Sequence, residues 1–565
     1  MTGPWPGLRA FLTGSFGDPG DWSPLVTMLH WALFRAFGDA PLGYRLTSLA
    51  LHWGVAVLLY RAARRLLGRE DLAFAVALLW SLFPSHAEVL AQTSFKKHQL
   101  VALFALLMLE SRADAGKVVC FVLALLCRES GLLLLPLQFF ANKESRKPSY
   151  VMAAVAVVYA FFHVAFLPRA LTGLMGGSLF YHLLTSSKIL SWHLCQLALP
   201  ISQSQEHSLS IPWFVPMLLA VAAVYSWKPV RKDPVLSFSA AWALLFLLPF
   251  TNILPYLNVS LTANRYHYMA SAGFLLFVAR LVERRKPSKR AVFGGAAAIG
   301  LFYCAILIPH AALYASPVDL WAQAAHAAPD NLRARLGYGA ALREEGRYAE
   351  AVAELDAANR LGVSPKEVYQ ELALAAHGAG DATKALSAAQ IRWTRRQDAL
   401  GYALLGTMQL ADGWYENHRR ALFNLRRAYE LSPTPEVAFQ LGLAEAANRR
   451  HENAIPMLEQ AASVPALRAQ ALAALARSLD AADREDEALK VLEESAGLEP
   501  LSPDDAWRLA VHYSAKRERS RALAVMDEMI ARLEGAPSEQ AKAAAAPYLK
   551  DARRRRQDIA ERRGR

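Results

Sequence analysis

Cysteine is scarce in this sequence, and the few cysteines lie in or beside apolar runs. The 565 residues contain four, at Cys120, Cys127, Cys195 and Cys304. They form no C-x-x-C pair and no spacing typical of metal ligands, which argues against a disulfide framework and a zinc site. The sequence also has no P-loop and no other glycine-rich nucleotide loop. No cleavable signal peptide is visible in Met1–Pro24, which lacks a basic start and an apolar core.

The amino-acid composition of the sequence changes near Pro317. Before this point come repeated apolar runs, and after it come Ala, Arg, Glu and Leu in the proportions of soluble helices. Leu25–Phe37 fits an interfacial helix. We expect ten membrane crossings, several of them shorter than the roughly 20 residues of a straight span. They are Tyr44–Arg61, Leu72–Pro84, Gln99–Leu109, Lys117–Cys127, Gly131–Ala141, Tyr150–Leu167, Ile211–Tyr225, Pro234–Phe250, Tyr266–Val282 and Ala291–Leu313.

Basic clusters between the apolar runs predict the orientation. Four connections are crowded with Lys and Arg: 61–69, 143–147, 228–232 and 280–290. The positive-inside rule places them in the cytoplasm, so the stretches that alternate with them, and everything after Leu313, face out. Much of the net charge of +13 lies in these clusters, so we expect a membrane protein and no nucleic-acid partner.

A repeat of about 34 residues begins after Pro329. Closing prolines recur at Pro329, Pro365, Pro433, Pro465 and Pro500. This is the period of tetratricopeptide repeats, which pair two amphipathic helices and stack into a solenoid with a concave binding surface. We predict six units, 331–365, 366–398, 399–433, 434–465, 466–500 and 502–535, and a capping helix over Ser538–Glu561. Passive spacing is the alternative role of such an array.

A polar stretch interrupts the membrane half at Phe83–Gln99. It holds five polar residues that hydrocarbon disfavours: His86, Glu88, Lys96, Lys97 and His98. A charge at mid-membrane costs roughly 2.5–3.5 kcal/mol on insertion scales. Either this stretch is a wet loop, or it is a polar site at the end of a helix pair. Arg128 and Glu129 interrupt a second apolar run. They are interpreted as an internal ion pair, as a tight turn, or as part of such a polar site.

Several short segments match, in order, the motifs of one family. Phe37-Gly-Asp-Ala-Pro-Leu-Gly-Tyr-Arg45 resembles F-G-x-x-P-x-x-Y-H/R, after Asp21-Trp-Ser-Pro-Leu25, which resembles aromatic-x-Pro-Leu. Phe83-Pro-Ser-His-Ala-Glu88 resembles H-P-x-H-x-E, and Cys127-Arg-Glu-Ser-Gly131 resembles S-K-E-x-G. Asn264–Gly273 resembles D-R-Y-x-Y-x-P-S-x-G. With the repeats behind them, these motifs resemble the transmembrane and tetratricopeptide-repeat-containing O-mannosyltransferases, glycosyltransferases of the GT-C fold.

The resemblance implies the fold and the activity. It implies an all-α chain, with a multi-pass GT-C-like domain over 1–316, a linker over 317–330, tetratricopeptide repeats over 331–536, and a capping helix and basic tail over 537–565. It implies transfer of a sugar, mannose foremost, from a polyprenyl-phosphate donor to hydroxyls of exported proteins, with the repeats binding acceptor or partner proteins. The lipid-linked sugar phosphate is expected as the donor substrate, and no cofactor is assigned. Whether a divalent metal is needed is left open. A bacterial inner membrane with periplasmic repeats is the expected location.

The departures from the family pattern support an alternative. The chain begins after the family's first helix and its acidic loop, Asn264 replaces an Asp, and Gln99 stands where an Asp is usual. An inactive, membrane-anchored scaffold for protein–protein interaction is therefore the second hypothesis.

The residues themselves suggest roles in such a transfer. An acid–base group must take the acceptor proton, for which Glu88 and His86 are the candidates. Cations must hold the leaving phosphate, for which Arg265, Lys96 and Lys97 are the candidates. Tyr266 and Glu129 are further candidates for contact with substrate. The alternatives are snorkelling for the cations, helix capping and packing for Glu88 and His86, and an interface belt for Tyr266.

Overall fold

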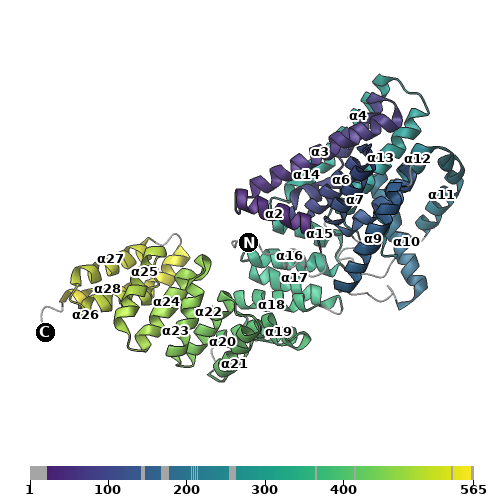
Figure 1. Ribbon diagram of the computed structural model, residues 1–565. Coiled ribbons are helices and arrows are strands. Elements are labelled where there is room, and N and C mark those ends of the chain that lie inside the picture. Colours follow the sequence, from purple (N-terminus) through teal and green to yellow (C-terminus); the bar gives the residue numbers. More distant parts are fainter. Residues whose placement is uncertain are drawn as a thin grey trace. The chain divides into compact units, whose positions relative to one another are not determined.

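The computed structural model describes residues 22–141, 147–166, 177–204, 206–207, 209, 211–212, 214–253, 262–362, 365–412, 415–535 and 539–561. Every regular element in these ranges is a helix (Figure 1), so the prediction of an all-α chain is confirmed. The chain divides into two compact units, Met1–Ala341 and Leu342–Arg565. The division falls C-terminal to the linker that the sequence predicts at 317–330.

The first unit is a set of helices of very different length, joined by short turns. Its elements are α2 (Pro24–Phe37), α3 (Pro41–Leu67), α4 (Glu70–Ser81), α5 (His86–Ala91), η1 (Thr93–Phe95), α6 (Lys96–Glu110), α7 (Asp114–Leu125), η2 (Glu129–Leu133), α8 (Leu134–Ala141), α9 (Lys147–Phe166), α10 (Leu179–Ala198), α11 (Phe214–Lys232), α12 (Pro234–Leu247), η4 (Leu248–Thr251), η5 (Asn264–Tyr266), α13 (His267–Glu283), α14 (Lys289–Leu313), α15 (Pro317–Ala327) and α16 (Leu332–Glu344). Each predicted crossing overlaps a helix, but Gly131–Ala141 spans η2 and α8, and Pro234–Phe250 spans α12 and η4. The helix α10 occupies a segment for which we expected an external loop.

Three stretches in the described part of the chain are long and apolar enough to cross a membrane: α3, α14 and Pro234–Thr251. Their outward surfaces are apolar, and Trp53 on α3 and Leu301 on α14 are each 73% exposed. A water-facing helix would carry polar residues at such positions, whereas a lipid-facing helix needs apolar ones. The total of ten crossings stays a prediction.

Three of the four basic clusters meet at one end of this unit. Arg280 Nε and Arg284 Nη2 both donate to Asp233 Oδ2 at 2.9 Å, next to the cluster at 228–232. Arg69 Nη2 donates to the carbonyl of Pro287 at 3.1 Å. The corresponding ends of α3 and α6 are joined by Arg61 and Glu110, 3.1 Å apart. Because the clusters lie at one end, they can all face one side of a membrane, as the positive-inside rule requires.

The core of the first unit depends on close backbone approach between α12 and α13. A Cβ added at Gly273 would lie 2.6 Å from the backbone nitrogen of Ala243 and 2.8 Å from the carbonyl oxygen of Ser239. Beside this contact, the indole of Trp242 donates to the carbonyl of Met269 at 2.8 Å. Glycine at position 273 therefore sets the distance between these two helices.

The second unit is a stack of helix pairs (Figure 1). Its members are α17 (Tyr348–Arg360), α18 (Lys366–Gly378), α19 (Ala382–Arg395), α20 (Ala399–Ala411), α21 (Tyr415–Leu431), α22 (Pro435–Ala447), α23 (His451–Ala462), α24 (Pro465–Ala481), α25 (Glu485–Leu498), α26 (Pro503–Ala515), α27 (Arg519–Glu534) and α28 (Glu539–Glu561). Each consecutive pair packs together. Along the sequence, the helices α16 to α27 fall two by two on the six predicted repeat units, with α16 and α17 on the first of them, and α28 falls on the predicted capping helix.

The turn inside a repeat uses one residue in the left-handed region. Gly346 and Gly380 hold this position in the first two repeats, with φ of 78° and 80°. Arg449, Asp483 and Arg517 hold it in the last three, with φ of 59°, 58° and 63°. The tight turn lets the second helix of each pair fold back along the first.

Candidate functional site

The polar stretch Phe83–Gln99 forms three short elements at the end of the first unit opposite the basic clusters. These are α5, η1 and the first turn of α6. They lie near the start of α3, at Tyr44, and near η5 ahead of α13. Of the two interpretations left open by the sequence, the buried polar site describes this stretch better, because His86, Glu88, Lys96 and His98 are all at least 95% buried.

Glu88 and Arg265 form the central contact of the site. Arg265 Nη1 donates to Glu88 Oε1 at 2.6 Å, and the backbone nitrogen of Arg265 donates to Glu88 Oε2 at 2.8 Å. The two residues are 177 positions apart in the sequence. Burial alone would lower the pKa of Arg265, but the charge of the Glu88 carboxylate raises it above its ordinary value. The pair therefore fixes a permanent cation at the start of η5.

Arg265 also belongs to a closed ring of contacts among basic and aromatic side chains. The Arg265 guanidinium lies over the rings of Phe95 and Tyr266, at 4.9 Å from each centroid. Tyr266 stacks on Phe250 with ring centroids 3.8 Å apart. The Arg128 guanidinium lies over the Phe250 ring, 5.4 Å from its centroid. Such contacts orient a guanidinium while leaving its edges free to bond an anion.

His98 completes the ring. Arg128 Nη1 donates to His98 Nε2 at 2.6 Å, and His98 meets Phe95 edge to face at 5.9 Å. The charges of Lys97 and Arg265 also act on His98. Lys97 is half-buried at the start of α6, and Glu129 is half-buried at the start of η2, next to Arg128.

Lys96 differs from the other cations of the site. Its side chain is fully buried, and its ammonium lies 5.7 Å from the centroid of the Tyr44 ring. Among the described residues, Lys96 Nζ has no hydrogen-bond partner. A buried ammonium without an anion is costly, which makes Lys96 a group prepared for an anionic ligand.

His86 lies in the interior, apart from the ring. Its Nε2 lies 3.1 Å from Ser271 Oγ, while its Nδ1 has no partner among the described residues. Trp80 and Tyr268 pack against it, with ring centroids 4.8 and 4.7 Å away. His52 lies 5.5 Å away in the same aromatic cluster.

A second histidine network, which the sequence did not reveal, lies beside the site. His193 and His267 approach at 2.9 Å, and His267 Nδ1 lies 3.3 Å from Ser85 Oγ. These histidines are isolated in the sequence, so no spacing could have joined them. The position that departs from the family motif, Asn264, is also engaged: its Nδ2 donates to Gln203 Oε1 and to the Ser204 carbonyl, each at 3.0 Å.

The site carries more positive than negative charge. Four basic side chains, of Lys96, Lys97, Arg128 and Arg265, face two carboxylates, of Glu88 and Glu129. No group of three or more His, Cys, Asp or Glu residues is arranged to hold a metal ion in the described ranges. The arrangement can bind an anion such as a phosphate through charge-assisted hydrogen bonds.

The fold and the site together define a class: an all-α protein with apolar helices of membrane length, a buried cationic site and tetratricopeptide-type helix pairs. The comparisons with known proteins narrow this class. The chain is 22% identical over 291 residues to a protein O-mannosyl-transferase of Caenorhabditis elegans, in an alignment that covers 46% of this chain and 42% of that protein. It is 31% identical over 126 residues to the protein O-mannosyl-transferase Tmtc1 of Drosophila melanogaster, covering 21% of this chain and 13% of that protein.

The chain thus resembles the transmembrane and tetratricopeptide-repeat-containing O-mannosyltransferases, which confirms the resemblance predicted from its motifs. It spans less than half the length of these curated relatives. No family model matches the chain.

Solved structures similar to this chain are tetratricopeptide-repeat proteins. One from Thermus thermophilus is 24% identical and covers 32% of this chain and 98% of its own, with a TM-score of 0.28. Another, YrrB, described as having an unusual peptide-binding site, is 19% identical and covers 26% of this chain and 75% of its own, with a TM-score of 0.23.

Proposed function

We propose that the chain is an integral-membrane glycosyltransferase that moves a sugar, mannose foremost, from a polyprenyl-phosphate donor to hydroxyl groups of exported proteins. The resemblance to O-mannosyltransferases supports the reaction class. The repeats, in this proposal, bind acceptor or partner proteins. The basic clusters that share one end of the first unit support a topology in which the site and the repeats face out, into the periplasm of a bacterial inner membrane.

The observation that carries the proposal is the buried ammonium of Lys96, which has no hydrogen-bond partner in the described part of the chain. In the transfer, the acceptor oxygen bonds to the anomeric carbon, and the bond from that carbon to the donor phosphate breaks. The phosphate leaves with the electron pair and gains negative charge. Lys96, Arg265, Lys97 and Arg128 are the cations that would stabilise this charge, with Arg265 oriented by Phe95 and Tyr266.

Glu88 and His86 remain the proposed groups for the proton of the acceptor hydroxyl. In the structure both oxygens of Glu88 accept hydrogen bonds from Arg265, so Glu88 also orients that cation. The Nδ1 atom of His86 has no described partner, which leaves it a site for a proton. Glu129 and Tyr266 would contact the substrate from the two sides of the ring.

A Lys96→Met variant tests the proposal. The measured quantity is transfer of label from radiolabelled polyprenyl-phosphate-mannose to membrane proteins by the purified full chain. Because Lys96 Nζ has no hydrogen-bond partner among the described residues and methionine keeps an unbranched apolar side chain, the variant should fold normally. We expect its transfer rate to fall about 10- to 100-fold, the scale of one lost charge-assisted hydrogen bond of about 1.5–3 kcal/mol.

Lys228→Met is the matched control, because Lys228 is exposed and belongs to a basic cluster. It should transfer like the wild type. Equal rates for Lys96→Met and the wild type would contradict the assigned site. No transfer by the wild type, together with tight peptide binding by the same chain, would favour the alternative function, a membrane-anchored scaffold.

A further inference from the structure

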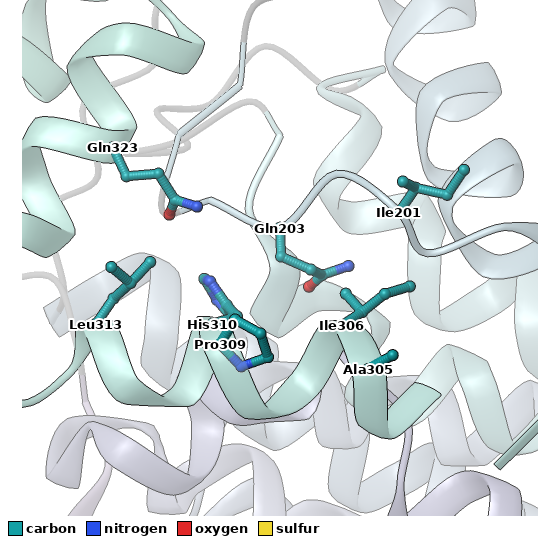
Figure 2. A pocket seen from close by; sticks show the side chains of 8 residues that line it. All are labelled: Ile201, Gln203, Ala305, Ile306, Pro309, His310, Leu313 and Gln323. Carbon is teal, nitrogen blue, oxygen red and sulfur yellow. The ribbon is translucent and has the colours of Figure 1, made fainter. Parts of the chain in front are cut away.

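A cavity of about 400 Å³ lies beside the site but outside it (Figure 2). Its volume falls within the range of about 300–1,000 Å³ that is usual for ligand pockets. Three segments of the first unit line it: the last turns of α14, the non-helical residues just before Ser204, and α15. The lining residues are Ile201, Gln203, Ala305, Ile306, Pro309, His310, Leu313 and Gln323.

The polar side chains of the cavity point toward one another, and two of them, His310 and Gln323, have buried atoms without a partner among the described residues. Figure 2 shows His310 rising from α14 toward the side chains of Gln203 and Gln323, which approach from the other two segments. His310 is only 4% exposed, yet neither of its ring nitrogens has a partner among the described residues. The Oε1 atom of Gln323 is likewise buried and without a partner. Buried polar groups are rarely left in this state, so a ligand that bonds them is expected.

The lining selects an uncharged ligand. Its polar groups are two amides and an imidazole, and it contains no carboxylate and no Lys or Arg to hold a phosphate. An extended polypeptide offers alternating N–H donors and C=O acceptors, which amide side chains match. The aliphatic walls formed by Ile201, Ile306 and Leu313 suit its side chains. The described residues of the lining include no Phe, Tyr or Trp, so among them a sugar ring finds no aromatic face to stack on.

The cavity is connected to the cationic site through one residue. Gln203 Oε1 accepts a hydrogen bond from Asn264 Nδ2 at 3.0 Å, and Asn264 directly precedes Arg265 in η5. A segment bound against Gln203 would therefore lie next to the turn that positions the Arg265 guanidinium.

We propose that this cavity binds an extended, uncharged, hydroxyl-bearing segment of the acceptor polypeptide. That the bound segment belongs to an acceptor protein rests on the proposed function. The binding itself requires no sugar donor. It places acceptor recognition in the first unit, in addition to any binding by the repeats.

Chemical protection of His310 tests this binding. The full chain in detergent is treated with diethyl pyrocarbonate, and modification of each histidine is followed by peptide mass spectrometry. The probe is a capped peptide of alternating alanine and threonine. It should slow modification of His310 about tenfold and leave His326, which is exposed on α15, unchanged. No protection, or equal protection by free mannose or by a capped Ala-Glu peptide, would overturn the proposal.

A variant keeps the test decisive if His310 reacts poorly. Gln323→Leu preserves the volume of the side chain but removes its hydrogen bonds, and it should weaken binding of the same peptide, fluorescently labelled, about tenfold, the scale of a neutral hydrogen bond. Gln390→Leu, at an exposed position on α19, should bind like the wild type. Unchanged affinity in Gln323→Leu would overturn the inference, whereas peptide binding without sugar transfer would overturn the proposed function and leave the inference intact.

Discussion

The two units differ in how far apart in sequence their charged partners lie. In the second unit Arg343 pairs with Glu371, Lys384 with Asp356, Arg477 with Asp505, and Arg508 with Asp480, in every case 28 residues apart. In the first unit the central pair, Glu88 and Arg265, is separated by 177 residues and almost fully buried. A repeating array makes the same neighbour contact again and again, while a site gathers single residues from distant segments.

The difference also concerns solvent. Most charged pairs of the repeats have at least one partner open to water, where an ion pair contributes about 0–1 kcal/mol. The pair of Glu88 and Arg265 is shielded, so loss of one member leaves a buried charge. The repeats should therefore tolerate the loss of single charges, and the site should not.

Arg265→Ala should produce the largest effect on stability. Removing the guanidinium leaves the Glu88 carboxylate buried and unpaired, at a cost of about 3–5 kcal/mol. Arg468→Ala breaks a pair with Glu494 in which both side chains are about half exposed, and it should cost less than about 1 kcal/mol. Denaturant unfolding of the full chain in detergent measures both, and similar losses would contradict the contrast between the two units.

Gly273→Ala should produce an intermediate effect. The added methyl group meets backbone atoms of α12, which cannot move without separating the helices, so we expect a loss of about 1–3 kcal/mol. Gly294→Ala on α14 is the control, because a Cβ at that position meets nothing within 4 Å. There the better helix propensity of alanine should stabilise the chain slightly. A loss of equal size in both variants would show that backbone approach is not the cause.

Asp398→Ala should produce an effect that depends on pH. Burial would raise the pKa of Asp398, but the Gly401 amide and the Arg392 guanidinium lower it below its ordinary value. Asp398 also caps α20 and pairs with Arg392, whose side chain is 1% exposed, so its loss should cost about 1–3 kcal/mol at pH 7. Because the folded pKa is lowered, this contribution is present above the pKa of the unfolded chain and is lost as the pH falls through the folded pKa.

The measurement for Asp398 is the difference in unfolding free energy between wild type and variant at pH 7 and at about pH 3. The difference should shrink at the lower pH. Asp558→Ala, at an exposed position on α28, should show little difference at either pH. A pH-independent loss for Asp398→Ala would mean that the charge of the carboxylate does not matter.

The confirmed prediction of an all-α chain with tetratricopeptide-type repeats came from a local pattern. The period of 34 residues placed the helix pairs of the repeats, because each pair depends on its own residues and its neighbours. The polar stretch at Phe83–Gln99 stood out because charges are costly beside apolar runs. By contrast, the stack of Phe250 on Tyr266 and the contact of His193 with His267 join segments whose spacing has no periodicity, so only the folded chain reveals them.

The His310 cavity shows the same limit. His310 is a single histidine near the end of an apolar run. From the sequence alone, such a histidine is interpreted as a residue that packs in the core. Its significance comes from Gln203 and Gln323, more than 100 positions away on one side and 13 on the other. Gln203 lies in no motif, and Gln323 lies in Trp321–Pro329, which resembles the family's junction into the first repeat, so no sequence signal would have brought the three together.

The left-handed turn residues of the repeats have a consequence for engineering. A non-glycine residue at positive φ costs about 1–2 kcal/mol, and Arg449, Asp483 and Arg517 all occupy this conformation, while Gly346 and Gly380 already avoid the cost. The C-terminal repeats thus carry strain at three separate turns that glycine would relieve, less what the more flexible unfolded chain takes back. These C-terminal repeats have therefore not reached their maximum stability, and glycine at the three turn positions should make them more stable.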